Sequence, residues 1–440
     1  MRMSFPLKLL AVVGLALLLF VPLAMTQGLV EVRNTRQIET ENQVARLTAR
    51  PQVLVGPLLV VPFTLEARRL QRNDPAGPAQ EVWEEERGEK VFVPASLDLA
   101  GDIRIEARRR GLYRTQVFRL AGPLKGRFEV PAQAGLQGAR NLRLGLPFLA
   151  LGIEDPRGIL NHMVLRTGGG ERPFLPGTGL AHPGSGVHAQ VPGLDLAAGA
   201  AFAFEIPLEL VGTRSLKIAP VAEETQVRLA GTWPAPSFEG GFAPLDRTWS
   251  GDGFTARWKI PFLSRDQASL LHGGPGAEAQ YFGVAFLDPV NIYLQSERAV
   301  KYGFLFVLLT FGAFLLREMV RALPIHPFQY FLVGASLAVF FLLLLGLAEH
   351  LGFPLAYATA TAANLALLAT YLTAVLGSRK EAFAFTAGLG LLYAALYGLL
   401  ASEDNALLLG SLLVFALLAA VMLGTRRMTW LKPGTPTEEG

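Results

Sequence analysis

The sequence of 440 residues contains no cysteine. This absence excludes disulfide bridges, thiolate metal sites, a catalytic thiol and a lipid anchor attached to cysteine. Histidine is also scarce, and none of the six is part of an HExxH zinc motif. His182 and His188 lie in the Gly- and Pro-rich segment 168–193, which we expect to be a long solvated loop. We therefore predict neither a metal ion nor another cofactor.

Motifs for nucleophilic catalysis are missing as well, since neither GxSxG nor SxxK occurs. Glu154 and Asp155 are adjacent, and neighbours in a strand point to opposite faces, so they do not form a carboxylate dyad. The DPRG sequence at 155–158 predicts instead a turn in which Arg157 forms an ion pair. These absences predict a protein that is not an enzyme.

Charge of one sign does not dominate the chain, whose net charge is +4. Residues 26–300 carry 30 basic and 29 acidic side chains, so the excess lies among the apolar runs. A topology rule for membrane proteins accounts for basic residues there. We expect no nucleic-acid partner.

Residues 51–300 read as an extracytoplasmic β-rich domain. Short alternating apolar runs stand between Gly and Pro residues, as is typical of sandwich-like all-β folds. The segment 68–88 reads as an insertion or the tip of a hairpin. Alternation continues to Gln295, so we expect a strand up to that residue, directly before an apolar run.

Six apolar runs are each near the roughly 20 residues that cross a bilayer. They span residues 9–24, 302–320, 328–347, 353–376, 382–401 and 406–424. The predicted organisation is therefore a transmembrane anchor at 1–26, a linker or helical stalk at 27–50, the β domain, a five-helix bundle at 301–427 and a tail at 428–440. The first run is longer than the apolar part of most signal peptides, which favours a retained anchor over a cleaved signal.

The charges between the runs predict the orientation. Basic residues flank alternate turns and the N-terminus, whereas the turns at Glu349-His350 and Glu403-Asp404 carry no Lys or Arg. By the positive-inside rule both termini are cytoplasmic and the β domain lies outside.

Several stretches resemble the CreD family of bacterial inner-membrane proteins. They include VGPLLVVPF (55–63), RRGLYRTQVFRLAGPLKGRF (109–128), TWPAPSFEGGFAP (232–244), GFTARWKIPFLSR (253–265) and PVNIYLQSERAVKYGFLF (289–306). The chain departs from the expected pattern at Asn291, where an acidic residue is typical, and at Asn405, where an aromatic one is. The resemblance implies an inner-membrane protein linked to envelope integrity or envelope stress, and it supplies no biochemical activity.

Two groups of side chains are candidate sites. A dense aromatic group suggests a platform for glycan or peptide, although such density is also typical of core packing; its members are Trp233, Phe238, Trp249 and Trp258. A charged group at the outer surface suggests coupling between the β domain and the bundle, although polar loop caps explain it equally well. Its members are Arg298, Lys301, Glu349, His350, Glu403 and Asp404.

The sequence thus favours a protein that binds an envelope partner or ligand and contacts the lipid bilayer. The alternative is a lipid or small-molecule transporter, which would require a cavity near Asn364, the one strongly polar side chain in the middle of an apolar run. A simpler interpretation of Asn364, among alanines, is one interhelical hydrogen bond in a closely packed bundle. A membrane-associated hydrolase is a third hypothesis, weakened by the missing motifs.

Overall fold

The computed structural model describes residues 5–71, 80–274, 276–286, 291–321, 325–402 and 406–425. It divides into two compact units, which we describe separately. The helical unit comprises Met1–Arg36 and Val290–Gly440, and the strand-rich unit comprises Gln37–Pro289. The predicted N-terminal helix, sandwich-like β domain and C-terminal helical bundle are confirmed.

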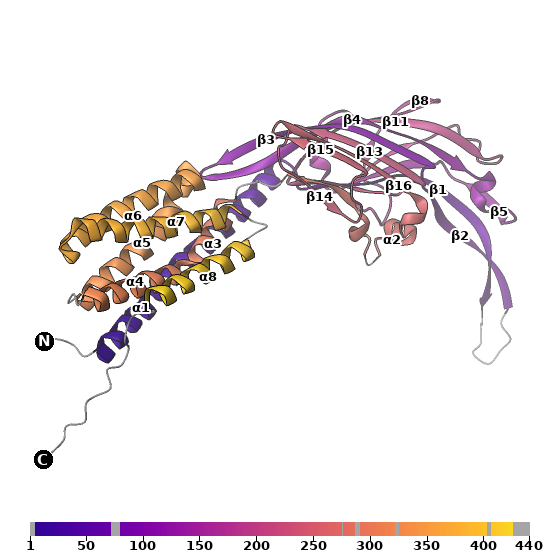
Figure 1. The fold of residues 1–440 in the computed structure, drawn as a ribbon. Helices are drawn as coiled ribbons and strands as arrows, with labels where there is room; N and C mark the ends of the chain where they lie inside the picture. Colours follow the sequence, from indigo (N-terminus) through magenta and orange to yellow (C-terminus); the bar gives the residue numbers. More distant parts are fainter. Residues whose placement is uncertain are drawn as a thin grey trace, which may run out of the picture. The chain divides into compact units, whose positions relative to one another are not determined.

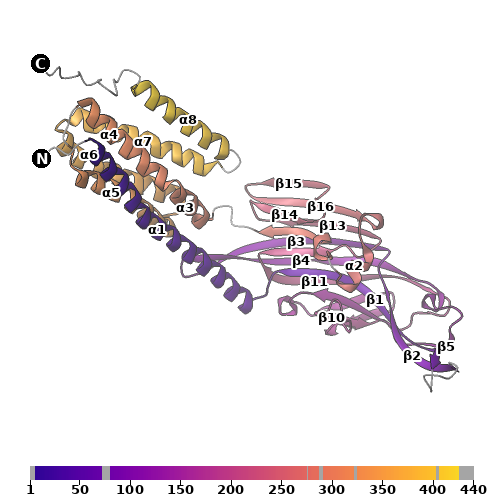
Figure 2. The ribbon, with the colours of Figure 1, turned by 90° about the horizontal axis from the view of Figure 1, so that it is seen from below.

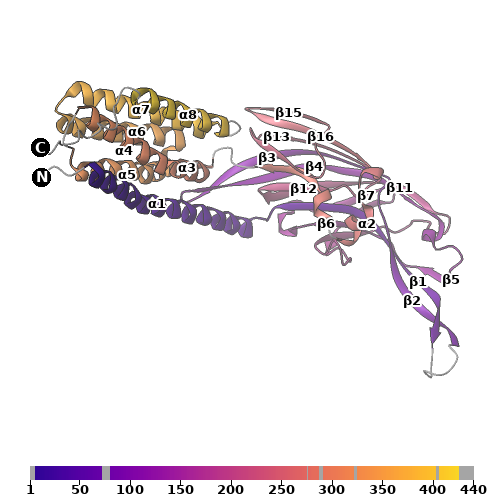
Figure 3. The ribbon, with the colours of Figure 1, turned by 60° about the horizontal axis from the view of Figure 1, so that its bottom comes forward.

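The N-terminal helix α1 (Phe5–Leu47) contains 43 residues, and Figure 3 shows it as one continuous element. At 1.5 Å per residue it is about 65 Å long, roughly twice the thickness of a bilayer's hydrocarbon core. The sequence predicted either a helical stalk or a linker for residues 27–50. Residues 27–47 belong to α1 and are helical.

Six further helices make up the rest of the helical unit. They are α3 (Ile292–Lys301), α4 (Gly303–Arg321), α5 (Pro327–Leu351), α6 (Phe353–Leu376), α7 (Arg379–Ala401) and α8 (Ala406–Thr425). Within the described residues, five stretches are long and apolar enough to cross a membrane: Leu7–Leu47, Ile292–Leu315, Pro327–Leu351, Phe353–Leu376 and Arg379–Ala401. The predicted run at 406–424 coincides with α8.

The prediction of a strand up to Gln295 is wrong, because α3 begins at Ile292. The side chain of Asn291 accepts hydrogen bonds from the backbone amides of Tyr293 and Leu294 and so caps the helix. An alternating apolar pattern over four residues fits an amphipathic helix as well as a strand. Here the hydrogen bonds that Asn291 accepts stabilise the first turn of the helix and so favour the helix over the strand.

Several polar side chains inside the helical unit form hydrogen bonds between helices. The Asn364 amide on α6 donates to the hydroxyl of Tyr393 on α7 at 2.8 Å, and the Tyr357 hydroxyl donates to the Tyr393 carbonyl at 2.8 Å. This confirms the interhelical hydrogen bond expected at Asn364. On three other helices, Lys8 of α1 forms an ion pair with Glu318 of α4, and Glu318 also accepts a hydrogen bond from the Tyr330 hydroxyl of α5.

The strand-rich unit is a sandwich of two sheets (Figure 1). One sheet has the order β14-β17-β12-β1-β6-β10-β9, with β2 and β5 also paired to β1. Its strands are β1 (Gln52–Gln71), β2 (Gln80–Phe92), β5 (Arg140–Leu144), β6 (Phe148–Ile153), β9 (Leu175–Pro176), β10 (Gly186–Gln190), β12 (Ser215–Ala219), β14 (Pro236–Gly240) and β17 (Phe282–Phe286).

The second sheet has the order β15-β16-β13-β3-β4-β11-β7-β8, much of which can be followed in Figure 2. Its strands are β3 (Ser96–Arg110), β4 (Tyr113–Val130), β7 (Val164–Thr167), β8 (Gly170–Pro173), β11 (Ala200–Thr213), β13 (Glu224–Gly231), β15 (Asp246–Ser250) and β16 (Gly253–Pro261). A short helix, α2 (Gln267–His272), follows β16.

Alternation places the apolar faces of both sheets in one core. Along β16 the side chains of Phe254, Ala256, Trp258 and Ile260 are buried and those between them are exposed. Deleting one large buried side chain from such a core typically costs 3–5 kcal/mol.

Of two irregular segments predicted from the sequence, one differs from expectation and the other agrees with one of its two interpretations. The segment 168–193 contains β8, β9 and β10, so the prediction of one long loop is wrong. Its short alternation, with Val187 and Ala189 buried, is masked in the sequence by the surrounding Gly and Pro residues. Residues 68–71 and 80–88 belong to the distal arms of the β1–β2 hairpin, where Gln71 pairs with Gln80, as the hairpin interpretation expected.

The buried carboxylate of Asp155 joins three segments of the sandwich unit. It accepts hydrogen bonds from the backbone amide of Arg50, at 3.0 Å, and from two guanidinium nitrogens of Arg157, at 2.9 and 2.6 Å. Arg157 also donates to the carbonyl of Arg46 at 2.8 Å, in the last turn of α1. The backbone of Asp155 exchanges two hydrogen bonds with the fully buried amide of Gln52. The predicted ion pair of Arg157 is confirmed, and it ties the end of α1 to β1.

Replacing Asp155 with asparagine tests this junction. The hydrogen bonds from Arg157 lower the pKa of Asp155 from 3.8 to about 2, which corresponds to about 2 kcal/mol of stability. Because the pKa is lower in the folded state, this stabilisation is complete at neutral pH and is lost as the pH falls from about 4 to 2. We expect Asp155→Asn to lower the free energy of unfolding by about 2 kcal/mol at pH 7, measured by denaturant titration.

Asp246→Asn is the matched control, because its carboxylate pairs with Arg257 at the exposed surface. We expect it to change stability by less than about 0.5 kcal/mol. Equal denaturation midpoints for Asp155→Asn and the parent at pH 7 would contradict the role given to Asp155.

A second prediction concerns the bundle interior. Tyr393→Phe removes the acceptor of Asn364, which leaves a buried amide without that partner. We expect a loss of about 1 kcal/mol, measured by denaturation of the purified protein in detergent. Tyr397→Phe is the control, since the ring of Tyr397 is more exposed and packs against Tyr357; an equal loss in both variants would show that the amide bond is unimportant.

Candidate functional site

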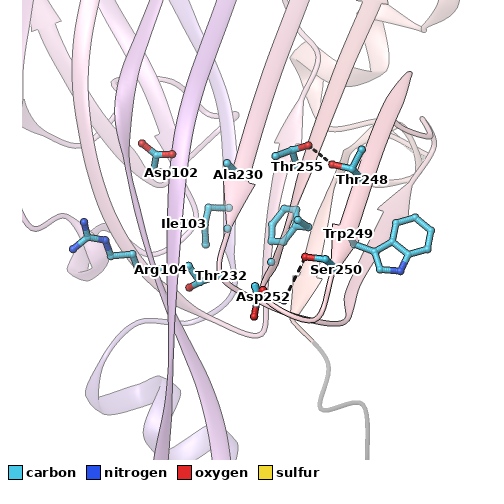
Figure 4. A pocket seen from close by; sticks show the side chains of 13 residues that line it. Asp102, Ile103, Arg104, Ala230, Thr232, Thr248, Trp249, Ser250, Asp252 and Thr255 are labelled. Atoms are coloured by element: carbon cyan, nitrogen blue, oxygen red, sulfur yellow. Dashed lines mark hydrogen bonds between the residues drawn. The ribbon is translucent and has the colours of Figure 1, made fainter.

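A groove of about 600 Å³ opens on the sheet formed by β3, β13, β15 and β16 (Figure 4). Its volume lies within the range of small-molecule sites. Four segments line it: residues 102–104 of β3, 230–232 at the end of β13, and the two arms of the β15–β16 hairpin with its turn. Seven of its lining residues have polar or charged side chains: Asp102, Arg104, Thr232, Thr248, Ser250, Asp252 and Thr255.

Trp249 of β15 is the aromatic side chain at the rim of this groove. It is 57% exposed, and the guanidinium of Arg247 lies 5.4 Å from its ring centroid. Figure 4 places its indole at one side of the groove and the side chains of Asp102 and Arg104, from β3, at the other. An exposed indole contributes a large, rigid apolar surface at low entropic cost.

The other three members of the predicted aromatic platform lie elsewhere. Trp258 is 1% exposed and its indole nitrogen donates to the Phe242 carbonyl at 3.1 Å. Phe238 packs edge-to-face on Trp258, and Trp233 is partly buried against the same core. The structure therefore does not bring the four together on one surface, and Trp249 alone is well exposed.

Hydrogen bonds organise the hairpin side of the groove. The hydroxyls of Thr248 and Thr255 lie 2.7 Å apart across the strand pair, and the amide of Asp252 donates to the Ser250 hydroxyl at 3.4 Å. The side chains of Asp102 and Asp252 form no ion pair with any residue in the described ranges. The groove thus offers carboxylate and hydroxyl groups on the exposed face of the sheet. The indole of Trp249, which pairs with the buried Phe254, lies at the edge of the sheet on its other face.

A second hollow has a volume of about 450 Å³. It lies over the first residues of β1, the last residues of β6 and Lys217 of β12. Arg50, Glu154, His182, Lys217 and Tyr281 are among its lining residues. Burial raises the pKa of the Tyr281 hydroxyl. Charges of both signs line this hollow, so it does not select a ligand of one charge.

His182 and His188 do not form a metal site with other ligands in the part of the chain that the structure describes. The imidazole of His188 is hydrogen-bonded to the Gly177 carbonyl at 2.7 Å. His182 lies against Gly273, whose φ of +66° ends α2.

The charged residues predicted to couple the two parts of the chain have the following positions. Glu349, on α5, is nearly buried and accepts a hydrogen bond from the Tyr293 hydroxyl of α3 at 3.1 Å, with Arg33 of α1 at 3.6 Å. Lys301 pairs with Glu297 one turn earlier, at 2.8 Å. His350 is exposed and its ring is bonded to the Gly346 carbonyl, while Arg298 lies on α3. Glu403, Asp404 and Asn405 lie outside the described residues. Coupling through this group remains a prediction.

Two features were missed by the sequence reasoning. The Lys8–Glu318 pair joins residues 310 positions apart, and in the sequence Lys8 is only one of the basic residues near the N-terminus that predict the orientation. The groove side chains come from four segments with no shared motif. A signal for Trp249 existed in its alternation with Arg247 on a short exposed strand, but the neighbouring core aromatics masked it.

Comparison with known proteins agrees with this architecture. The family model described as "Inner membrane protein CreD" matches residues 4–431. The inner membrane protein CreD of Escherichia coli K12 is 34% identical over 426 residues, which cover 96% of this chain and 93% of that protein. This family is not a known enzyme family. The chain has helices long and apolar enough to cross a membrane before and after the β-sandwich in the sequence, and it matches along nearly its whole length, so it belongs to the CreD family of inner membrane proteins.

Proposed function

We propose that this protein supports cell-envelope integrity or the envelope stress response by binding an envelope ligand or partner rather than by catalysis. The sandwich is the binding part, and the helical bundle holds it at the membrane. In this proposal both termini are cytoplasmic and the sandwich is periplasmic, as the basic residues at alternate turns favour.

The observation that carries the proposal is the groove beside Trp249. It combines an exposed indole with two carboxylates that have no ion-pair partner in the described residues, and with several hydroxyls. Sugars present apolar C–H faces and many hydroxyl groups, so a glycan matches both halves of this surface. The ligand class we propose is therefore a saccharide of the envelope, such as a peptidoglycan fragment.

The Asp155 carboxylate supports the choice of binding over acid–base catalysis. It is held by Arg157 and the Arg50 amide, and its pKa is lowered, so it remains ionised and occupied at neutral pH. General acid–base catalysts need a pKa near the working pH. No observation in the bundle favours transport, since Asn364 is buried and hydrogen-bonded to Tyr393.

The test is a calorimetric titration, in which soluble disaccharide-peptide fragments of peptidoglycan are added to the full-length protein in detergent and the dissociation constant is measured. We expect Trp249→Ala to weaken binding by about 2 kcal/mol, or roughly 30-fold, because an aromatic anchor of an interface typically contributes that much.

Trp83→Ala is the matched control. Trp83 is 47% exposed and also lies under an arginine, with Arg140 at 4.5 Å from its ring, but it belongs to β2 and not to the groove. Saccharide binding that is unchanged in Trp249→Ala, or lost equally in both variants, would refute the assignment of the groove.

A further inference from the structure

The hairpin of β3 and β4 carries a concentration of arginine that neither the fold nor the groove requires. Its two strands are joined by a two-residue loop, Gly111 with φ of +62° and the 46% exposed Leu112. A glycine at the first loop position permits this tight turn. Between residues 104 and 119 there is one acidic side chain, Glu106, and there are six arginines: Arg104, Arg108, Arg109, Arg110, Arg114 and Arg119.

In the paired strands, arginines lie opposite other arginines and not opposite acidic residues. Arg109 lies directly opposite Arg114 across the strand pair, and Arg104 lies opposite Arg119. Like charges at directly opposed positions destabilise a hairpin. Such an arrangement persists at a stability cost, which an anion bound between the guanidinium groups would remove.

Elsewhere in the sandwich, several exposed arginines have acidic partners. Arg228 pairs with Asp98 and Arg166 with Glu171, for example. By contrast, the exposed Arg108, Arg109 and Arg114 form no ion pair with any residue in the described part of the chain. Their positive charge is therefore available to a partner from outside.

Strand register places the tip of this hairpin at one particular end of the sandwich. Gln52, at the start of β1, pairs with Leu216 of β12, whose neighbour Ser215 pairs with Ala285, near the end of β17. The chain thus connects to α1 and to α3 at this same end. Thr213, the last residue of β11, pairs with Val117 of β4.

The hairpin continues beyond this level. Four more residues of β4 and the loop lie past Val117, an extension of about 15 Å. Figure 1 shows β3 and β4 continuing as a two-stranded arm past the other strands of the sandwich. The arm therefore projects from the end of the sandwich through which the chain is tethered to the membrane.

We propose that this basic arm binds the headgroups of anionic phospholipids in the leaflet on the sandwich side. Guanidinium groups form bidentate hydrogen bonds with phosphate, and basic side chains close to an anionic bilayer are attracted to it strongly. Leu112 at the tip supplies an apolar contact at the headgroup boundary. The inference is independent of the saccharide groove, because it rests on the arm alone.

The experiment uses the absence of native cysteine. Leu112→Cys introduces a unique thiol for a fluorophore in the full-length protein, which is reconstituted in nanodiscs containing a headgroup quencher. Phosphatidylglycerol then replaces phosphatidylcholine in steps. We expect quenching to rise with the anionic fraction and to fall in high salt, because screening weakens exposed charge interactions.

In the Leu112→Cys background, Arg109→Gln with Arg114→Gln should lower the equilibrium constant for the lipid-bound tip roughly 25-fold, at about fivefold for each arginine. The control pair Arg87→Gln with Arg172→Gln removes the same charge from β2 and β8 and should have no effect. Arg109→Lys with Arg114→Lys keeps the charge and should retain most of the binding. This variant also shows that any loss is not caused by misfolding.

Three results would overturn the proposal. The first is equal quenching in neutral and anionic nanodiscs. The second is an equal loss of quenching in the control variant Arg87→Gln with Arg172→Gln, and the third is unchanged quenching in Arg109→Gln with Arg114→Gln. Inorganic phosphate added to anionic nanodiscs, and separately to neutral ones, distinguishes the two sources of the same chemistry. If phosphate suppresses the lipid-dependent quenching only at high concentration, the result supports binding to lipid headgroups. If phosphate binds tightly and quenching does not depend on the lipid, the arm binds a soluble anion and the proposal is refuted.

Discussion

The buried carboxylate of Asp155 is the constraint on which the sandwich end of this protein depends. It is almost inaccessible to solvent and has lost its hydration, so it remains charged only because Arg157 and the Arg50 amide surround it. The same arginine caps a carbonyl in the last turn of α1, and Gln52 joins the turn to β1. One ion thereby connects the end of the long helix, the first strand and the turn after β6.

The end of the sandwich that Asp155 secures also carries the features that we assign to binding. The groove is lined by the last residues of β13 and by the turn of the β15–β16 hairpin, next to residues 102–104 of β3. The basic arm continues from those residues of β3, and Arg104 belongs to both. The polar and charged side chains of the groove and the arm thus lie at the end of the sandwich from which the chain continues into α1 and α3, whereas apolar side chains fill the interior between the sheets.

In the helical unit, several buried polar side chains from different helices bond to one another. Asn364 and Tyr357 both reach Tyr393, and Glu318 receives Lys8 and Tyr330. In an apolar environment an unpaired amide or carboxylate is costly, so these pairs specify which helices are neighbours. The outer leucines of the same helices remain free for contact with lipid.

The sequence by itself determined the class of architecture, since long apolar runs and short alternating runs separate membrane helices from a β domain by length and period. It also determined the pairing of Arg157, which depends on residues within one turn. Which side chains from distant segments meet depends on the folded chain: Lys8 pairs with Glu318, Asp155 accepts from the Arg50 amide, and Trp249 lines the same groove as β3. The tertiary structure also separated Trp249, which is exposed, from Trp258, which is buried. Aromatic residues on neighbouring strands have the same local pattern, and only the register of the sheet and its position at the edge or the centre distinguish a surface from a core.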